Sequence, residues 1–374
     1  MWRDASFCSR GFFILETTLG GGLRVKISSA ICTGTLLACA MPSCVFSASH
    51  RPRQSAASQA QDAAVVPGKP GTKTVIDEMG RHVAVPVNVQ RVVSLAPNLT
   101  ETIYALGLED KLVGDTTYCD TPAAAKDKPH VGATINPSLE AIVALHPDLV
   151  LATAINRWET VDELERLGIP VYTTDPHTVR EMLTSIAQLG DLIGAHEQGA
   201  SLAAKLQSTL DELQTRLREK PLLHVLFLVW DDPPITIGQN TFIADALRWA
   251  GAESVLISKQ DWPQISMEEV VRLAPEYIVM VSAHSESGEP KKSNDLSQRP
   301  TWNQLEAVKL GRVVVVSDVM TKPSPGLIEG IVSLAHSLHP EVFGTAGQNS
   351  KFEKSETESL AINVGRRVGV LCAL

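Results

Sequence analysis

The chain of 374 residues has a mass of 40.3 kDa and is too long for one small domain, while its 44% hydrophobic and 20% charged residues are typical of a globular protein with a packed core. Its 33 basic and 42 acidic residues give a net charge of −9, which argues against a surface that neutralises the phosphates of a nucleic acid. The six cysteines form no C-x-x-C pair and have no zinc-type spacing with histidine. The sequence therefore predicts neither a disulfide framework nor a metal site.

The beginning of the chain has the features of an export signal. Two basic residues precede an apolar stretch, residues 27–37, which is too short to span a bilayer. The stretch ends in the letters LLAC, which resemble the lipobox of bacterial lipoproteins and would make Cys39 the lipidated first residue of the mature protein. The alternative is ordinary secretion with cleavage after Ser47 or Ala48. Residues 1–38 are predicted to be a signal peptide, and either alternative places the protein in the periplasm or cell envelope.

Two further segments have compositions that do not support a packed core. Residues 39–72 consist mainly of Ser, Ala, Gln, Pro and Gly, which is typical of a flexible tether. Folded structure is expected to begin near Lys73. Residues 345–374 contain one short apolar stretch without a strong period, and we expect them to form a tail.

Short β-branched runs alternate with helical patterns between residues 90 and 344, which is typical of parallel βα units. Eight strands are predicted, namely Arg91–Leu95, Lys111–Gly114, Asp148–Ala152 and Val171–Thr173, and then His224–Val229, Ser254–Ile257, Tyr277–Val281 and Arg312–Val316. Between the two groups, residues 196–220 carry leucines at helical spacing. The sequence predicts an α/β fold of two similar lobes, residues 73–195 and 221–344, each a parallel sheet flanked by helices, joined by one long helix.

An internal repeat supports two lobes of similar structure. Ser138–Leu151 (SLEAIVALHPDLVL) aligns without gaps to Ser266–Val279 (SMEEVVRLAPEYIV), at an offset of 128 residues. Two lobes joined by a helix make a cleft between them, which is a common place for a ligand.

Several motifs together indicate a known family. They are RVVSLAPNLTE, YCDTP, PSLEAIVALHPDLV, LGIPVY, WPQISMEEV and PSPGLIEGIVSLAHSLHP, and the match covers about residues 74–344. In these motifs the chain resembles the cobalamin-binding branch of the periplasmic substrate-binding proteins of ABC importers. The resemblance implies a monomer with a bilobal fold and a rigid linking helix, uptake of a corrinoid or an iron chelate, and neither catalysis nor a resident cofactor.

Ligand-binding residues are expected beyond the carboxyl ends of the strands, where open parallel sheets bind ligands. The candidates in these loops are Tyr118, Trp158, Trp230, Trp262 and Asp318. A corrin ring is a wide, largely apolar disc edged with amides, so it needs flat apolar side chains and a few polar groups at its rim. The resemblance implies aromatic contacts at Tyr118 and Trp262, and it aligns Trp230 with a Phe of a relative. The alternative is that these aromatics close the tops of the lobes.

Two glutamates occupy equivalent places in the repeat. Glu140 and Glu268 lie in the first turn of corresponding helices, and the resemblance implies that they form ion pairs with the two subunits of the permease. The alternative is that acids are simply favoured at helix N-termini. Ser266 and Glu269 have the spacing of a capping box, so Glu269 is assigned to capping.

The remaining reactive side chains have simple structural interpretations. Cys119 is predicted to be a small packing residue, and His146 ends a helix where the repeat has Ala274. His284, at a predicted strand end, could offer a nitrogen to a bound metal but is expected to be solvated.

Three alternatives to corrinoid capture stay open at this point. Ferric-siderophore or haem binding is the nearest, although the loops offer only Arg157, Lys259 and Lys322 as cations for an anionic chelate. An exported α/β enzyme is another, with Asp231, Asp232 and Asp318 as its acids, but no G-x-S-x-G, P-loop or H-E-x-x-H motif occurs. The third is an envelope interaction module without a small ligand. The sequence also departs from one cobalamin binder in having no Trp within residues 132–137.

Overall fold

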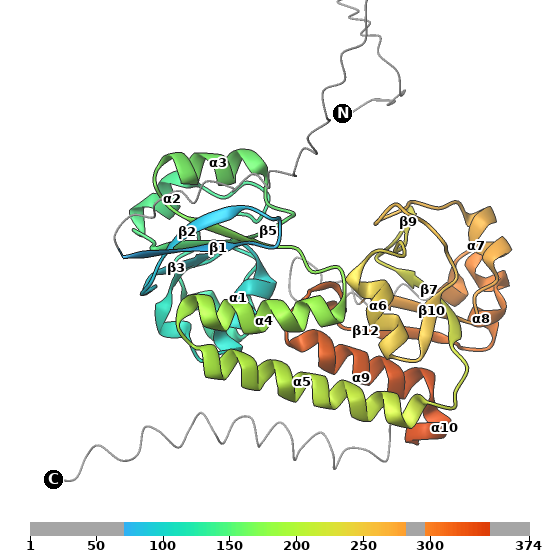
Figure 1. The fold of residues 1–374 in the computed structure, drawn as a ribbon. Helices are drawn as coiled ribbons and strands as arrows, with labels where there is room; N and C mark the ends of the chain where they lie inside the picture. Colours follow the sequence, from blue (N-terminus) through green and yellow to red (C-terminus); the bar gives the residue numbers. More distant parts are fainter. Residues whose placement is uncertain (1–70, 282–295, 345–374) are drawn as a thin grey trace, which may run out of the picture. The chain divides into compact units, whose positions relative to one another are not determined.

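The computed structural model describes residues 71–281 and 296–344, which belong to one compact unit of the chain (Figure 1). Within this unit the strands and helices form two α/β lobes, each with a four-stranded parallel sheet. The predicted fold class is therefore confirmed.

The first sheet contains four of the predicted strands. They are β3 (Val92–Ser94), β4 (Leu112–Gly114), β5 (Leu149–Thr153) and β6 (Val171–Thr174), all parallel in the order β4-β3-β5-β6. The helical segments of this lobe are α1 (Pro97–Ala105), η1 (Glu109–Lys111), η2 (Ala123–Asp127), α2 (Leu139–Ala144) and α3 (Trp158–Arg166). Strands β5 and β6 are buried along their whole length, as expected for a parallel sheet covered on both faces.

A β-hairpin precedes this sheet and was not predicted. Strands β1 (Thr72–Ile76) and β2 (His82–Pro86) pair antiparallel, and Val83 and Val85 are buried. Each strand has only five residues, and only β2 alternates regularly between buried and exposed positions. The alternating run is therefore too short to be recognised in the sequence.

The second lobe repeats the topology of the first. Its sheet contains β7 (Leu223–Leu228), β10 (Ala252–Ser254), β11 (Tyr277–Val281) and β12 (Val313–Val316), parallel in the order β10-β7-β11-β12. A small antiparallel pair, β8 (Trp230–Asp231) and β9 (Pro234–Ile235), follows β7. The helical segments are α6 (Phe242–Trp249), α7 (Met267–Leu273), η3 (Leu296–Gln298), η4 (Trp302–Gln304), α8 (Glu306–Lys309), η5 (Asp318–Thr321), α9 (Gly326–Leu338) and α10 (Pro340–Phe343).

One predicted strand is wrong in its bounds. The sequence predicted Ser254–Ile257, but β10 begins at Ala252 and ends at Ser254. Gly251, with a φ of 77°, ends the turn after α6 and lets the strand start at once. Ile257 is 80% exposed and belongs to the loop that follows, so its β-branched side chain gave a misleading strand signal.

The repeat is visible in the backbone as well as in the strand order. In both lobes the second strand of the chain order lies at one edge, and the first and third strands are neighbours. His146 and Ala274, at equivalent places after α2 and α7, have φ values of 45° and 44° although neither is glycine. Both residues precede a proline, and both end their helices, so the structural interpretation of His146 is confirmed.

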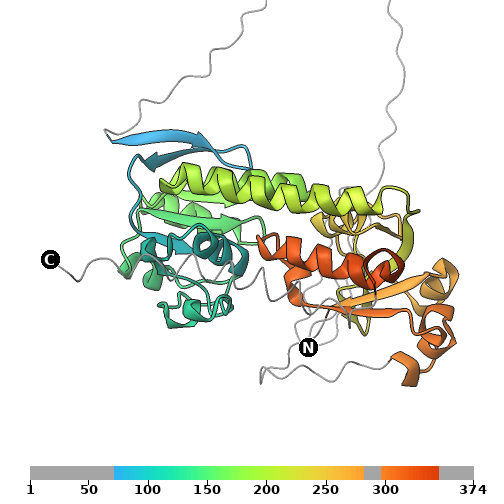
Figure 2. The same ribbon diagram turned by 90° about the horizontal axis from the view of Figure 1, so that it is seen from below.

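The long helix is α5 (His196–Leu217), which runs beside α4 (Val179–Ile193) in Figure 2. Gly194, with a φ of 89°, ends α4, and the two helices then touch at Gly190 and Gly199, where a Cβ on Gly190 would lie 2.8 Å from the Cα of Gly199. Leucines of α5 at helical spacing, Leu210, Leu213 and Leu217, are buried in a core shared with helices of both lobes. This continuous core ties α5 to the two sheets.

Candidate functional site

The predicted ligand-binding residues lie in the segments that follow the parallel strands, either in loops or at the start of the next short element. Tyr118 lies between β4 and η2 and is 62% exposed, while its neighbour Cys119 is 2% exposed. The thiol lies 3.2 Å from Thr100 Oγ1 and 3.3 Å from Thr116 Oγ1, and burial raises its pKa. Cys119 is therefore a packing residue that points inward, which leaves the neighbouring Tyr118 ring directed toward solvent.

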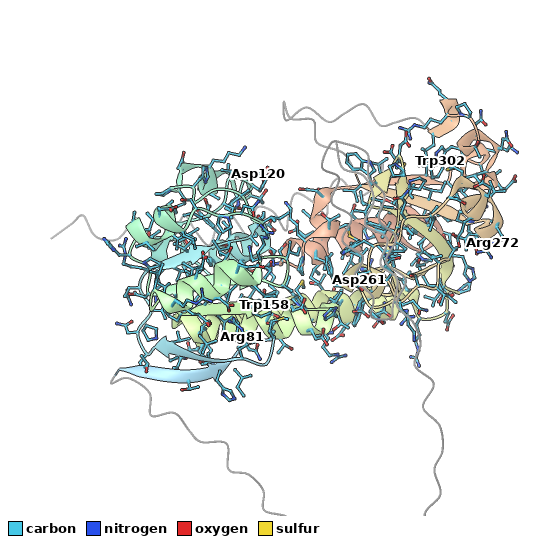
Figure 3. The ribbon with its side chains drawn as sticks, turned by 90° about the horizontal axis from the view of Figure 1, so that it is seen from above. Arg81, Asp120, Trp158, Asp261, Arg272 and Trp302 are labelled. Atoms are coloured by element: carbon cyan, nitrogen blue, oxygen red, sulfur yellow. The ribbon has the colours of Figure 1, made fainter. Side chains whose placement is uncertain are left out.

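Trp158, at the start of α3, is in contact with the hairpin. The Arg81 guanidinium lies over the Trp158 ring, with its central carbon 5.1 Å from the ring centroid (Figure 3). Arg81 is fixed by Asp77 at 2.6 Å and by Glu165 at 2.8 Å. One face of the indole is thus covered by a cation, and only the rest of this side chain is open to a ligand.

Trp230 and Trp262 belong to the second lobe and are 54% and 47% exposed. The Trp230 indole N–H donates to the carbonyl of Asp232 at 2.8 Å, which leaves the ring faces as its contact surface. Neighbouring Asp231 forms an ion pair with Arg299 at 2.9 Å. This pairing neutralises one of the acids that an enzymatic site would need.

The loop that carries Trp262 is fixed to the segment after β9 by backbone hydrogen bonds. Thr236 N–H donates to Pro263, Gly238 N–H to Asp261 and Gln239 N–H to Ser258, with lengths of 3.0, 2.8 and 3.0 Å. At Gly238 the two segments are so close that a Cβ would lie 2.0 Å from the Gln260 oxygen. Trp262 is therefore presented by a loop with a defined backbone, although its side chain is half exposed.

Asp318 lies in η5 and is part of a charged cluster. Its Oδ2 is 2.8 Å from Lys322 Nζ, and the same ammonium is 3.5 Å from Oε1 of Glu101. Glu101 is a residue of α1 in the first lobe, only 8% exposed, and its Oε2 accepts a hydrogen bond of 2.6 Å from Ser324 Oγ. Burial opposes the charged form of Lys322, but its hydrogen bond to Asp318 and the charges of Glu101, Asp318 and Asp120 raise its pKa above the usual value.

Sequence reasoning missed Glu101 and Ser324 in this cluster. The two residues are hydrogen-bonded to each other but are separated by 223 positions in the chain, and no local pattern connects them. The one available signal was the placement of Glu101 within an otherwise uncharged helix.

The two repeated glutamates have the same local structure. Glu140 and Glu268 follow the N-caps Ser138 and Ser266, whose hydroxyls accept the N–H three residues on at 3.2 Å. The Ser138 hydroxyl donates to Glu140 at 3.0 Å. The glutamate's own backbone N–H and the serine hydroxyl hold the pKa of each carboxyl below its usual value. Both carboxylates are thus ionised and oriented at the surface.

Glu269 differs from its predicted role. Its backbone N–H binds Ser266, but its carboxylate is 3.0 Å from Arg272. This (i, i+3) ion pair takes the place of the reciprocal bond of a capping box, which the structure does show at Thr178 and Glu181.

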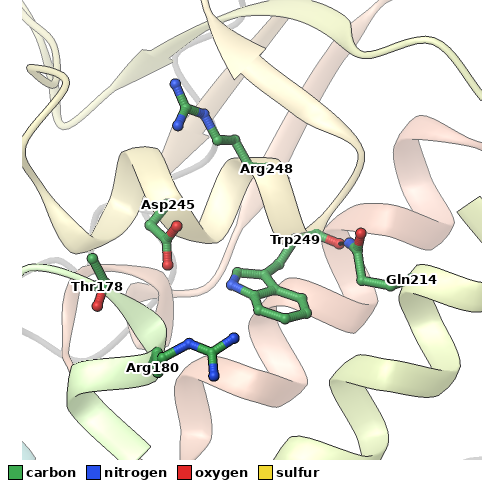
Figure 4. A pocket seen from close by; sticks show the side chains of 6 residues that line it. All are labelled: Thr178, Arg180, Gln214, Asp245, Arg248 and Trp249. Carbon is green, nitrogen blue, oxygen red and sulfur yellow. Dashed lines mark hydrogen bonds between the residues drawn. The ribbon is translucent and has the colours of Figure 1, made fainter. Parts of the chain in front are cut away.

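A cavity of about 340 Å³ is lined by none of the predicted site residues (Figure 4). It is lined by Thr178, Arg180, Gln214, Asp245, Arg248 and Trp249, from α4, α5 and α6 and the cap of α4. Asp245 Oδ2 accepts the N–H of Val179 at 2.9 Å, which links α6 to the start of α4. In Figure 4 the Arg248 guanidinium points away from Arg180, so the two cations do not converge on one ligand position.

Neither a metal-binding cluster nor a membrane-spanning helix is present in residues 71–281 and 296–344. No cluster of three or more His, Cys, Asp or Glu side chains in this part of the chain could hold a metal ion. Within the same residues, no helix is long and apolar enough to cross a membrane. Cys39 and His284 lie outside the described residues.

Comparison with known proteins gives consistent matches. A model of the periplasmic binding protein family matches residues 92–319. An uncharacterized ABC transporter substrate-binding lipoprotein of Bacillus subtilis, YvrC, is 32% identical over 279 residues, which are 72% of this chain and 86% of that protein. A vitamin B12-binding protein of Vibrio campbellii is 32% identical over 202 residues, 54% of this chain and 73% of that protein.

Solved structures of two kinds of binding protein share the fold. The periplasmic vitamin B12 binding protein BtuF of Vibrio cholerae has a TM-score of 0.60 and 26% identity, and the match covers 68% of this chain and 98% of that one. A periplasmic heme binding protein of Pseudomonas aeruginosa has a TM-score of 0.60 and 25% identity, with 68% and 94% covered. The fold alone therefore does not choose between these two ligands.

Proposed function

The chain belongs to the periplasmic binding protein family, as a substrate-binding component of an ABC transporter, and from this premise we propose that its ligand is a cobalamin-type corrinoid. The observation that carries the proposal is the set of exposed aromatic rings at the carboxyl ends of the strands. Tyr118 comes from the first lobe, and Trp230 and Trp262 come from the second. A corrin disc offers each of these rings a flat apolar surface.

The pairing of one cation in these loops favours a ligand without carboxylates. Of the three candidate cations, Lys322 is paired with Asp318 and Glu101, Arg157 donates to the neutral side chain of Asn136 at 3.1 Å, and Lys259 is exposed. A ferric siderophore or haem presents anionic groups that such cations would have to bind. The amides at the rim of a corrinoid need only hydrogen-bond donors and acceptors.

We further propose that Glu140 and Glu268 dock the protein onto the permease, one glutamate to each subunit. Their support is the matching geometry in the two lobes, where a serine cap orients an ionised carboxylate at the surface. Exposed rim charges of this kind govern register and association rate more than affinity. Residues 1–38 as signal peptide, residues 39–72 as tether and Cys39 as lipid anchor complete the proposal, and the lipoprotein relative in Bacillus subtilis supports the anchor.

Ligand titration tests the corrinoid. Cyanocobalamin, dicyanocobinamide, haemin and a ferric siderophore are added to the purified protein while tryptophan fluorescence is followed. We expect quenching by the corrinoids, and a tenfold or greater loss of affinity in Trp262→Ala or Tyr118→Ala, because a buried aromatic contact contributes about 1.5–3 kcal/mol. Trp249→Phe, in the separate cavity, is the control and should bind as the wild type does. Tight binding of haemin with no response to either corrinoid would overturn the assignment.

Transport separates docking from binding. The double variant Glu140→Ala, Glu268→Ala should keep the ligand affinity of the wild type and lose at least tenfold in uptake rate. Glu159→Ala is the matched control, since Glu159 lies at the same position of α3 but outside the repeat. A fall in ligand affinity in the double variant would place the two carboxylates in the binding site instead.

A further inference from the structure

The repeated segments of the two lobes, residues 138–151 and 266–279, are identical at five positions. Three of these positions have a role in the fold: a serine caps each helix, a leucine packs on the core of each lobe, and a proline follows each left-handed residue. These pairs are Ser138 and Ser266, Leu145 and Leu273, and Pro147 and Pro275. The two identical pairs that remain are Glu140 with Glu268 and Val143 with Val271.

Val143 and Val271 are exposed although their side chains are apolar. They are 37% and 49% exposed, whereas the residue before each of them, Ile142 or Val270, is 0% exposed in the core of its lobe. Valine is not favoured at the surface of a helix, because its β-branched side chain loses rotamer freedom there. The packing of the lobes therefore accounts for Ile142 and Val270 but not for a valine at the next position.

Other exposed positions of the same two helix ends differ between the lobes. Ala144 corresponds to Arg272, and His146 corresponds to Ala274, and all four residues are exposed. The fold thus tolerates different side chains at these surface positions. A shared valine in both lobes therefore needs a cause outside the fold.

Each valine shares a helix face with the glutamate of the proposed docking contact. Val143 follows Glu140 by three residues, and Val271 follows Glu268 by three, a spacing that places the Cβ atoms about 5–6 Å apart. Both glutamates are exposed, and the backbone N–H and the capping serine hold the pKa of each carboxyl below its usual value. Each lobe therefore offers the same pair, an oriented anion beside a small apolar surface.

We propose that Val143 and Val271 are apolar contacts of the permease interface, each packed beside the basic group that pairs with the glutamate of its lobe. This inference rests on the proposed docking through Glu140 and Glu268. The partner that fits has two equivalent subunits, each with a cation next to an apolar side chain. Exposed charges govern the rate of association, whereas packed apolar contacts slow dissociation, so the glutamates and the valines have separable tasks.

Binding kinetics with the ABC permease of this importer, purified in lipid nanodiscs, test the two tasks. The double variant Val143→Thr, Val271→Thr should raise the dissociation rate about tenfold and leave the association rate unchanged, because threonine keeps the shape of valine but puts a hydroxyl into the apolar contact. Each single variant should raise it about threefold, since the two contacts are equivalent. Val87→Thr, at an exposed valine outside the repeat, is the control and should bind as the wild type does.

An unchanged dissociation rate in the double valine variant would overturn the apolar contact, and an effect confined to one lobe would overturn the equivalence of the two contacts. Urea stability and ligand affinity should match the wild type, and a loss in either would assign the valines to the fold or to the ligand site instead. The double variant Glu140→Ala, Glu268→Ala separates the two proposals. It should slow association, and wild-type kinetics in it would refute docking by the glutamates, whereas a normal dissociation rate in the valine variant would refute only the apolar contact.

Discussion

Gly238 is the residue at which one methyl group should do most to disturb the proposed ligand site. In Gly238→Ala the new Cβ would lie 2.0 Å from the oxygen and 2.9 Å from the carbon of the Gln260 carbonyl, and 3.2 Å from the Ser258 oxygen. All three atoms belong to the backbone, so none can turn away as the end of a side chain could. Ordinary contact begins at 3.4 Å, so the segments must separate by about 1.4 Å, the difference between 3.4 and 2.0 Å.

A separation of that size breaks the hydrogen bonds that hold the Trp262 loop. The bonds from Gly238 N–H to Asp261 and from Gln239 N–H to Ser258, 2.8 and 3.0 Å long, lie at the point of contact. Each contributes about 0.5–1.5 kcal/mol, so the free energy of unfolding should fall by about 1–3 kcal/mol. Because Trp262 moves with the loop, corrinoid affinity should fall about tenfold as well.

Urea denaturation and fluorescence titration of the same preparations measure the two effects. Gly326→Ala is the control for the substitution itself, since its new methyl would meet the nearest atoms at 3.6–3.8 Å and should leave stability equal or slightly higher. Trp262→Ala should reproduce the loss of affinity with little loss of stability. Full stability of Gly238→Ala would refute the close approach on which the reasoning depends.

Three further predictions concern stability. Gly190→Ala should lower the free energy of unfolding by about 1–3 kcal/mol in urea, because its Cβ would lie 2.8 Å from the Cα of Gly199, and wild-type stability would contradict this packing. Ser138→Ala should lower the free energy of unfolding by about 1 kcal/mol, because the helix loses its cap. An unchanged melting temperature in thermal unfolding would contradict this and mean that solvent replaces the hydroxyl. Burial raises the pKa of Glu101 in the folded protein. The contribution of this carboxyl to the free energy of unfolding is therefore fully present below its unfolded-state pKa of 4.5 and is lost as the pH rises through its folded-state pKa. The stability of Glu101→Gln relative to wild type should therefore increase from pH 4.5 toward neutral pH, and a constant difference would contradict the sign.

The sequence was sufficient for features that depend on neighbours along the chain. Seven of the eight predicted strands overlap the observed strands closely, because buried parallel strands read as β-branched runs whatever their partners are. The internal repeat added a second line of evidence. Because the two segments align, it predicted that Glu140 and Glu268 lie in the first turn of equivalent helices, as the structure shows. Local signals failed at Ile257, where a β-branched residue lies in an exposed loop.

Features that depend on distant contacts could not be predicted. The Arg81 guanidinium lies over Trp158, and the sequence gives no reason to connect these two positions. The same holds for Glu101, whose hydrogen bond to Ser324 joins residues from different lobes. In both cases the role of a candidate changes, since Trp158 is partly covered and Lys322 is already paired. Residue type therefore identified where a ligand site could lie, and tertiary contacts decide which of its charges remain available.

The two lobes are alike at the starts and ends of helices α2 and α7 and differ in the loops at the ends of their strands. Helices α2 and α7 are nearly identical at their ends, with a serine cap, a glutamate in the first turn and a left-handed residue before proline in each lobe. The loops at the strand ends differ between the lobes. The first lobe offers a tyrosine, Tyr118, whereas the candidates of the second lobe are Trp230, Trp262 and Asp318. A partner built from two equivalent subunits requires two equivalent contacts, whereas one asymmetric ligand held between the lobes requires two different walls. Equivalence at Glu140 and Glu268, together with divergence at the aromatic loops, is the pattern expected if, as we propose, the protein delivers one ligand to a symmetric permease.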